Sequence, residues 1–175
     1  MAIKSQFEKE DWEMLLFTPF WVMEIVSKAD GVTDDGERKV FFKEIKRLSL
    51  DKTNALTQEI FTEISRNMES VSSDLSRDKR DPTYAIVDVR KILDGAPPEL
   101  EVDTFCELLF QMGITIADSS GSITNATRRV DQAELRALSG LAILLEIDLE
   151  KLEEEDSKIV FQIHGYLKRI ESTVL

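Results

Sequence analysis

Hydrophobic side chains recur at helical spacing along most of the chain. Apolar residues three and four positions apart indicate helices that bury one face. In chain order, the pattern predicts helices over about 7–17, 20–29, 34–49, 51–68, 84–93, 99–117, 135–147 and 149–170. A strand is the alternative for 84–93, where Ile86, Val87, Val89 and Ile92 are β-branched. We therefore expect an all-α fold of about seven to eight helices.

Local signals place the boundaries between these helices. Thr18 can cap the second helix, with Pro19 in its first turn, where a missing amide is not needed. Residues 20–26 are apolar nearly all round, which is typical of a central buried helix, and Gly31 is placed to end it. Residues 69–82, ESVSSDLSRDKRDP, are polar and Ser-rich without helical periodicity. We expect them to form a long connection.

The first half of the chain has a partial copy in the second half. Matching Asp30 to Asp118 also pairs Phe17 with Phe105, Trp21 with Leu109 and Val26 with Ile114, at an offset of 88 residues. Beyond the turn the offset is 97, so the second turn is nine residues longer, and Asp34, Glu37 and Leu48 meet Asp131, Glu134 and Leu145. A buried helix, an acidic turn and a second helix thus occur twice, at about 17–51 and 105–148. Because one such unit cannot cover its own apolar face, we expect one domain, 1–175.

The acidic turns have two interpretations. Asp34 with Glu37, and Asp131 with Glu134, fit the capping box, in which an acceptor starts a helix and a Glu three residues later reaches back to it. Asp30 and Asp118 are harder to explain, because each ends a predicted helix and so faces the negative end of its dipole. That end disfavours a carboxylate by about 0.3 to 1 kcal/mol unless an amide donor or a cation compensates.

A cation is chemically reasonable at these turns. Calcium and magnesium bind carboxylate, carbonyl and hydroxyl oxygens, and the candidate ligands are Asp30, Asp34, Asp35, Glu37, Asp118, Asp131 and Glu134. The EF-hand pattern is absent, because Val32 and Asp35 occupy its third and sixth positions. Any site would therefore be of another type.

Composition narrows the classes of partner. The chain has 34 acidic and 22 basic residues, for a formal net charge of −12. Nucleic acid and membrane surfaces are therefore poor partners, whereas metal cations and basic protein surfaces are favourable ones. The single cysteine, Cys106, excludes an internal disulfide and fits a reducing compartment, so we expect a cytoplasmic protein. The longest apolar run, 15–26, contains Pro19 and Glu24 and is too short to span a bilayer, so we expect no transmembrane segment.

Few residues are suited to catalysis. The only histidine, His164, lies on an apolar helix face, and Cys106 lies in a strongly apolar segment beside Phe105 and Leu109. Both are interpreted as structural residues. The glycines form no phosphate-binding loop, and nothing marks a sugar-binding cleft.

The segment from Pro19 to Glu37, PFWVMEIVSKADGVTDDGE, resembles the TerB-like family of tellurite-resistance proteins. The segments ITIADSSG and VDQAELRALSGLAILLEI resemble the later helix pair of that family. The matching positions are Asp30, Gly31, Glu37, Asp118 and Glu134, while Ser119 stands where a Gly would follow the Asp. The resemblance implies an all-helical fold without established enzymatic activity, a role in stress and metal-anion resistance, and an acidic surface for metal ions or partner proteins.

Three functional hypotheses follow. The leading one is a non-enzymatic stress-response module that binds a divalent cation, such as calcium or magnesium, or a basic protein partner through its acidic turns. The first alternative is a structural or scaffolding protein whose acidic residues only cap helices. The second is a carboxylate-metal hydrolase, which would need ligands from both repeats to converge in a cleft.

Overall fold

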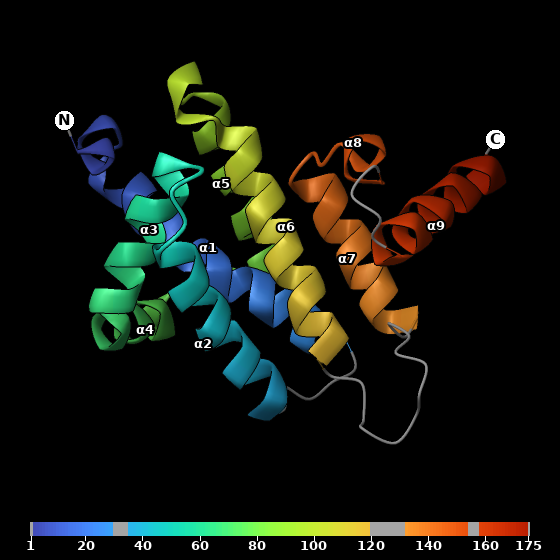
Figure 1. Ribbon diagram of the computed structural model, residues 1–175, viewed down its shortest axis with the longest axis horizontal. Helices are drawn as coiled ribbons and strands as arrows, with labels where there is room; N and C mark the ends of the chain where they lie inside the picture. Colours follow the sequence, from blue (N-terminus) through green and yellow to red (C-terminus); the bar gives the residue numbers. More distant parts are fainter. Residues whose placement is uncertain (1, 30–34, 120–131, 154–157, 175) are drawn as a thin grey trace.

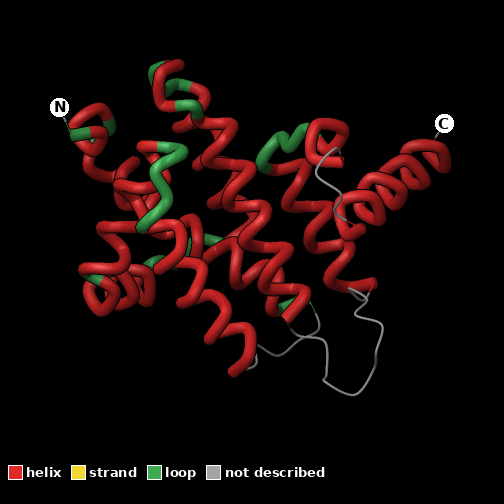
Figure 2. The backbone as a smooth tube through the Cα atoms, in the orientation of Figure 1, coloured by secondary structure: helices red, strands yellow, loops and turns green. Residues whose placement is uncertain are grey.

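The computed structural model describes residues 2–29, 35–119, 132–153 and 158–174 (Figure 1). Within them the chain forms nine α-helices and two short 3-10 helices, without any strand (Figure 2). The elements are η1 Ile3–Gln6, α1 Lys9–Ser27, α2 Asp35–Ser49, α3 Ala55–Arg66, α4 Met68–Arg77, α5 Pro82–Asp94, η2 Pro98–Leu100, α6 Val102–Ser119, α7 Gln132–Leu144, α8 Leu149–Glu153 and α9 Lys158–Val174. The all-α prediction is confirmed, and the strand alternative for 84–93 was wrong because α5 covers that segment.

Helix α1 is continuous, so the prediction of two helices divided at Thr18 was wrong. Pro19 lies inside α1, and the Thr18 hydroxyl donates to the Met14 carbonyl oxygen at 2.9 Å instead of capping a new helix. A proline within a helix costs roughly 3 kcal/mol. Burial of Trp12 and Trp21, one on each side of Pro19, offsets that cost, because tertiary packing supplies most helical stability.

Helix α4 occupies most of the segment expected to be a long connection. Val71 is buried, and Met68 and Leu75 pack against the core, which gives the helical spacing i, i+3, i+7. The prediction of a connection over 69–82 was therefore wrong, since the serines obscured a one-sided apolar stripe. The remaining link ends at Asp81, whose carboxylate accepts the Thr83 amide at 2.9 Å and caps α5.

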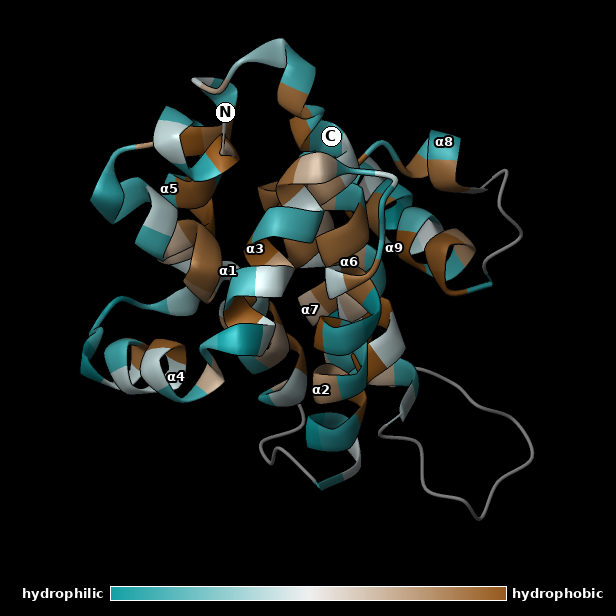
Figure 3. Ribbon diagram, turned by 60° about the vertical axis from the view of Figure 1, so that its left-hand side comes forward, coloured by the Kyte–Doolittle hydropathy of each residue, from teal (hydrophilic) through white to brown (hydrophobic). Residues whose placement is uncertain are grey.

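Helices α1 and α6 form the centre of the fold. Helix α1 packs against α5, α6 and α7, while α2 packs against α3 and α6. The largest buried side chains come from α1, α2, α3 and α6, and they include Trp12, Trp21, Phe41, Phe61, Phe105 and Phe110. Figure 3 shows hydrophobic residues concentrated where these helices face one another. One hydrophobic cluster includes residues from every α-helix.

The C-terminal part lies at one side of this core. Helix α9 packs against α7 and α8, and Val160 and Ile163 fix it through burial. The segment predicted as one helix over 149–170 is thus described as two helices, α8 and α9, with residues 154–157 outside the described ranges. None of the helices in the described ranges combines the length and apolar character needed to cross a bilayer.

Candidate functional site

The described flanks of both acidic turns lie at the same end of the molecule. Helices α1 and α6 end there and α2 and α7 begin there, at the lower side of Figure 1. The pairs α1 with α7 and α2 with α6 are in contact, so the helices that flank the two turns belong to one packed group. Asp30, Asp34 and Asp131, three of the candidate ligands, lie outside the described residues.

Two of the predicted ligands are buried carboxylates. Glu37 is 2% exposed and Glu134 is 5% exposed, and they occupy the first turns of α2 and α7. Each takes part in at least one hydrogen bond or electrostatic contact. Burial of a carboxylate is unfavourable without such partners, and the positive helix N-terminus supplies part of the compensation. Both glutamates are therefore held in place by local structure.

The remaining predicted ligands differ in exposure. Asp35 is exposed at the start of α2, whereas Asp118 is partly buried in the last turn of α6 and has an interaction partner. The described residues contain no group of three or more histidine, cysteine, aspartate or glutamate side chains arranged to hold a metal ion. A cation site at this end would therefore need oxygen ligands from the turn residues outside the described ranges.

Ser27, in the last turn of α1, adds an unusual feature beside the first turn. Its side chain is almost fully buried, and its Oγ has no hydrogen-bond partner among the residues described. A buried hydroxyl without a partner costs about 1 to 3 kcal/mol.

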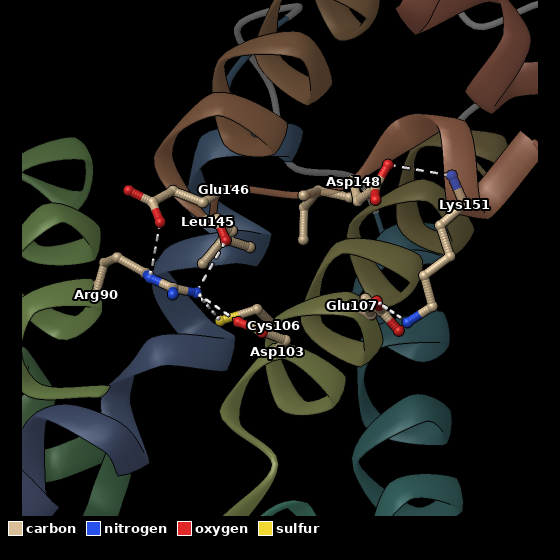
Figure 4. Close-up of a pocket in the computed structure, with 9 residues that line it drawn as sticks. Arg90, Asp103, Cys106, Glu107, Leu145, Glu146, Asp148 and Lys151 are labelled. Atoms are coloured by element: carbon tan, nitrogen blue, oxygen red, sulfur yellow. Dashed lines mark hydrogen bonds and ion pairs between the residues drawn. The ribbon is translucent and has the colours of Figure 1, made fainter. Parts of the chain in front are cut away.

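A cavity of about 300 Å³ lies at the other end of α6 and α7 (Figure 4). Its walls come from α5, the first half of α6, the segment that joins α7 to α8, and α8 itself. The lining residues are Arg90, Asp103, Cys106, Glu107, Leu145, Glu146, Ile147, Asp148 and Lys151. None of the residues predicted as ligands belongs to this cavity.

Arg90 is the central group of the cavity, with a side chain only 14% exposed. Its Nη2 lies 2.9 Å from Asp94 Oδ1, its Nη1 lies 3.2 Å from Asp103 Oδ1, and its Nε lies 3.4 Å from Glu146 Oε2. Nη1 also donates to the Leu145 carbonyl oxygen at 3.4 Å. The guanidinium therefore joins α5, α6 and the end of α7, and its donors are used by the protein itself.

The other charged groups of the cavity are also paired. Lys151 Nζ donates to Glu107 Oε1 at 2.6 Å, while Asp148 accepts the Lys151 amide and so caps α8. Burial raises the pKa of the Cys106 thiol to about 11, although the Arg90 guanidinium beside it acts in the opposite direction. A protonated thiol is a poor nucleophile, so the cavity does not provide an activated cysteine.

Sequence reasoning missed Arg90 and its carboxylate partners. The available signal was one arginine within the apolar stretch of α5, a position that calls for charged partners. His164, expected to be structural, is partly buried on α9 and does not line the cavity. Cys106 is buried as expected.

No protein-family model, curated protein or solved structure matches the chain. The resemblance to TerB-like proteins therefore depends on the two quoted motifs alone.

Proposed function

We propose that the protein is a non-enzymatic binding module whose acidic end takes up a cation. The ligand is a divalent metal ion such as calcium or magnesium, or the basic surface of a protein partner. The observation that carries this proposal is the pair of buried carboxylates, Glu37 and Glu134, in the first turns of two helices that begin at the same end of the fold. The resemblance to TerB-like proteins adds a stress-response role to the proposal.

The proposal treats α1 with α2 and α6 with α7 as two copies of one helix, acidic turn and helix unit. Its support is the crossed packing, in which the first helix of each unit contacts the second helix of the other. In this arrangement, oxygen atoms of the two turns would bind cations that lie close together. The buried Ser27 hydroxyl is a further oxygen beside the first turn.

The structural alternative, in which the acids only cap helices, also accounts for first-turn glutamates. The two hypotheses differ in what a cation does to stability. A ligand that binds only the folded state stabilises it by about 2.7 kcal/mol at one hundred times its dissociation constant, whereas a pure cap gains nothing from the ion.

Calorimetric titration and thermal unfolding with CaCl₂ and MgCl₂ test the proposal. The wild-type protein should release or absorb heat with at least one ion and unfold at a higher temperature in its presence. Asp30→Ala, Glu37→Gln and Glu134→Gln should weaken that binding at least about tenfold, because each removes a negative charge. Glu10→Gln, at an exposed site in the first turn of α1, is the matched control and should leave binding unchanged.

Two results would count against the cation part of the proposal. One is the absence of heat and of thermal stabilisation with both ions. The other is equal weakening by Glu10→Gln and by the two buried-site variants, which would indicate general screening of a protein with net charge −12.

A further inference from the structure

The outward face of α2 differs in charge from the rest of this acidic protein. Between 35 and 50 the core-facing side contains Glu37, Phe41, Glu44, Ile45 and Leu48, all buried. The opposite side contains seven exposed residues that we call the α2 basic face, namely Arg38, Lys39, Phe42, Lys43, Lys46, Arg47 and Leu50. Of the three acidic residues in this range, only Asp35 is exposed, and it lies at the start of the helix.

Four of the five cations form no salt bridge within the part of the chain that the structure describes. Arg47 is paired with Glu44, at 2.7 Å between Nη2 and Oε2. Arg38, Lys39, Lys43 and Lys46 form no salt bridge with any residue in the described ranges. Elsewhere exposed lysines commonly face an acid, as in Lys91 with Asp88 and Lys151 with Glu107. The α2 basic face is therefore a local positive field on a chain of net charge −12.

The helix dipole explains only part of this arrangement. Lys46 and Arg47 lie in the last turn of α2, where cations interact favourably with the negative helix end. Arg38 and Lys39 directly follow the first turn and gain nothing from that end, because the effect is limited to the terminal turns. Lys39 and Lys43 also form a like-charge pair four residues apart, which mildly destabilises an isolated helix.

Two large apolar side chains are exposed among these cations. Phe42 is 51% exposed and Leu50 is 70% exposed. The Phe42 ring makes an edge-type contact with the Phe41 ring, with ring centroids 5.6 Å apart, so one aromatic contact orients a side chain that remains half exposed. Aromatic side chains held in this way give contact area at a low entropic cost.

We propose that the α2 basic face is a docking surface for an acidic, amphipathic segment of another protein. Carboxylates of that segment would pair with Lys39, Lys43 and Lys46, and its apolar side chains would cover Phe42 and Leu50. Charge complementarity carries the proposal, because cations without a salt bridge in the described ranges flank two exposed apolar side chains, Phe42 on α2 and Leu50 just after its end. A helix of 15 residues is about 22 Å long, which suits a short helical partner.

The net negative charge outside α2 disfavours the binding of larger polyanions and of a second copy of the chain. A bilayer or a nucleic acid extends far beyond α2 and would meet the acidic remainder of the molecule. Two copies, each with a charge of −12, also repel one another at low ionic strength, which disfavours pairing of the chain with itself. A short segment interacts mainly with the field of the α2 basic face.

The test uses the full chain and a fluorescein-labelled peptide of about 20 residues, a length that allows a helix to form in solution. The peptide has Leu at positions i, i+3, i+4 and i+7 and Glu at the polar positions. In a second peptide, every Glu is replaced by Lys. Binding is measured by fluorescence anisotropy, and the amide signals that shift in an isotope-labelled protein locate the contact.

Two protein variants change the α2 basic face. One variant combines Lys39→Glu, Lys43→Glu and Lys46→Glu, and another combines Phe42→Ser and Leu50→Ser. The charge-matched control combines Lys79→Glu, Lys158→Glu and Lys168→Glu, all at exposed positions.

We expect the acidic peptide to bind the wild-type protein, to shift amide signals of α2 and to lose affinity when salt is added. The three reversals on α2 should weaken binding at least about tenfold, the Phe42 and Leu50 variant should weaken it severalfold, and the control should change it less than about twofold. The proposal is overturned if the acidic peptide does not bind, if the Lys peptide binds equally well, or if the control weakens binding as much. It is also overturned if phosphatidylserine vesicles bind α2 more tightly than the peptide does, or if the reversals on α2 only dissociate a dimer of the wild-type chain.

Discussion

At the scale of single residues, buried polar groups determine how the helices start and meet. Asn54 is almost fully buried, and its Oδ1 accepts the Thr57 amide at 2.7 Å while its Nδ2 donates to the carbonyl oxygens of Leu100 and Glu101. One side chain thus caps α3 and ties it to the start of α6. Arg90 acts in the same way for α5, α6 and α7. The polar groups of Asn54 and Arg90 have hydrogen-bond partners within the protein, whereas the Ser27 hydroxyl has none among the described residues.

Cys106 provides a test at this scale, because its burial argues against thiol chemistry. With a pKa of about 11, roughly one thiol in a thousand is ionised at pH 8. The native protein should therefore react with a disulfide reagent such as DTNB at pH 8 at least about a hundredfold more slowly than the protein unfolded in urea. Absorbance of the released thiolate measures both rates. Equal rates would show that the thiol is accessible and would reopen the question of a cysteine-dependent activity.

At the scale of helices, spacing of apolar residues was a good guide to where a helix exists but a poor guide to where it ends. The face of α2, with Phe41, Ile45 and Leu48 buried, could be predicted because local periodicity and tertiary burial agree. The junction at Pro19 could not, because core packing on both sides outweighed a local capping signal. Helix α4 was missed because only Val71 in its serine-rich sequence is fully buried.

The acidic end and the Arg90 cavity differ in how far the sequence predicts them, because only the first follows a local signal. Glu37 and Glu134 could be selected from the sequence, since first-turn acids follow a local rule. The Arg90 cavity could not, because its contacts join residues that are 13 and 55 positions apart. Those partners depend on how α5, α6 and α7 pack, and no local signal encodes that packing.

Two helical glycines provide a test at the scale of helices. A Cβ at Gly113 would lie 3.1 Å from Leu141 Cδ2 and 3.4 Å from Val22 Cγ1, where α6 meets α7 and α1, whereas at Gly140 no atom lies within 4 Å. Gly140→Ala should raise the free energy of unfolding by about 0.5 to 1 kcal/mol, because alanine favours the helix. Gly113→Ala should gain less, and Gly113→Leu should lose about 1 to 3 kcal/mol through overpacking. Urea unfolding measures all three variants. A stabilising Gly113→Leu would contradict the close packing of α6 against α7.

At the scale of the whole molecule, charge is unevenly distributed. The excess of 34 acidic over 22 basic residues makes the chain strongly anionic, yet the α2 basic face concentrates cations on one helix. The same helix begins at the acidic end, with Glu37 buried in its first turn. The two proposals thus place ligands of opposite charge at different parts of α2. A basic ligand or metal ion would bind near its start, and an acidic segment would bind along its outward side.

Self-repulsion of these charges should limit the stability of the folded chain at low ionic strength. Raising NaCl from about 20 to 300 mM shortens the Debye length from roughly 20 Å to 6 Å and should raise the unfolding temperature, since distant like charges are then screened. Reversing three lysines changes the net charge from −12 to −18, so both triple variants should unfold at lower temperatures than the wild type in low salt and gain more from NaCl. Because the α2 variant and the Lys79, Lys158 and Lys168 control have the same net charge, −18, the long-range repulsion that salt screens is similar in both, and they should respond alike. Thermal unfolding followed by circular dichroism checks this. If low salt instead destabilised only the control variant, charge reversal on α2 would not add to the repulsion within the folded chain. The control variant would then no longer be a matched comparison for the peptide affinity of the α2 variant.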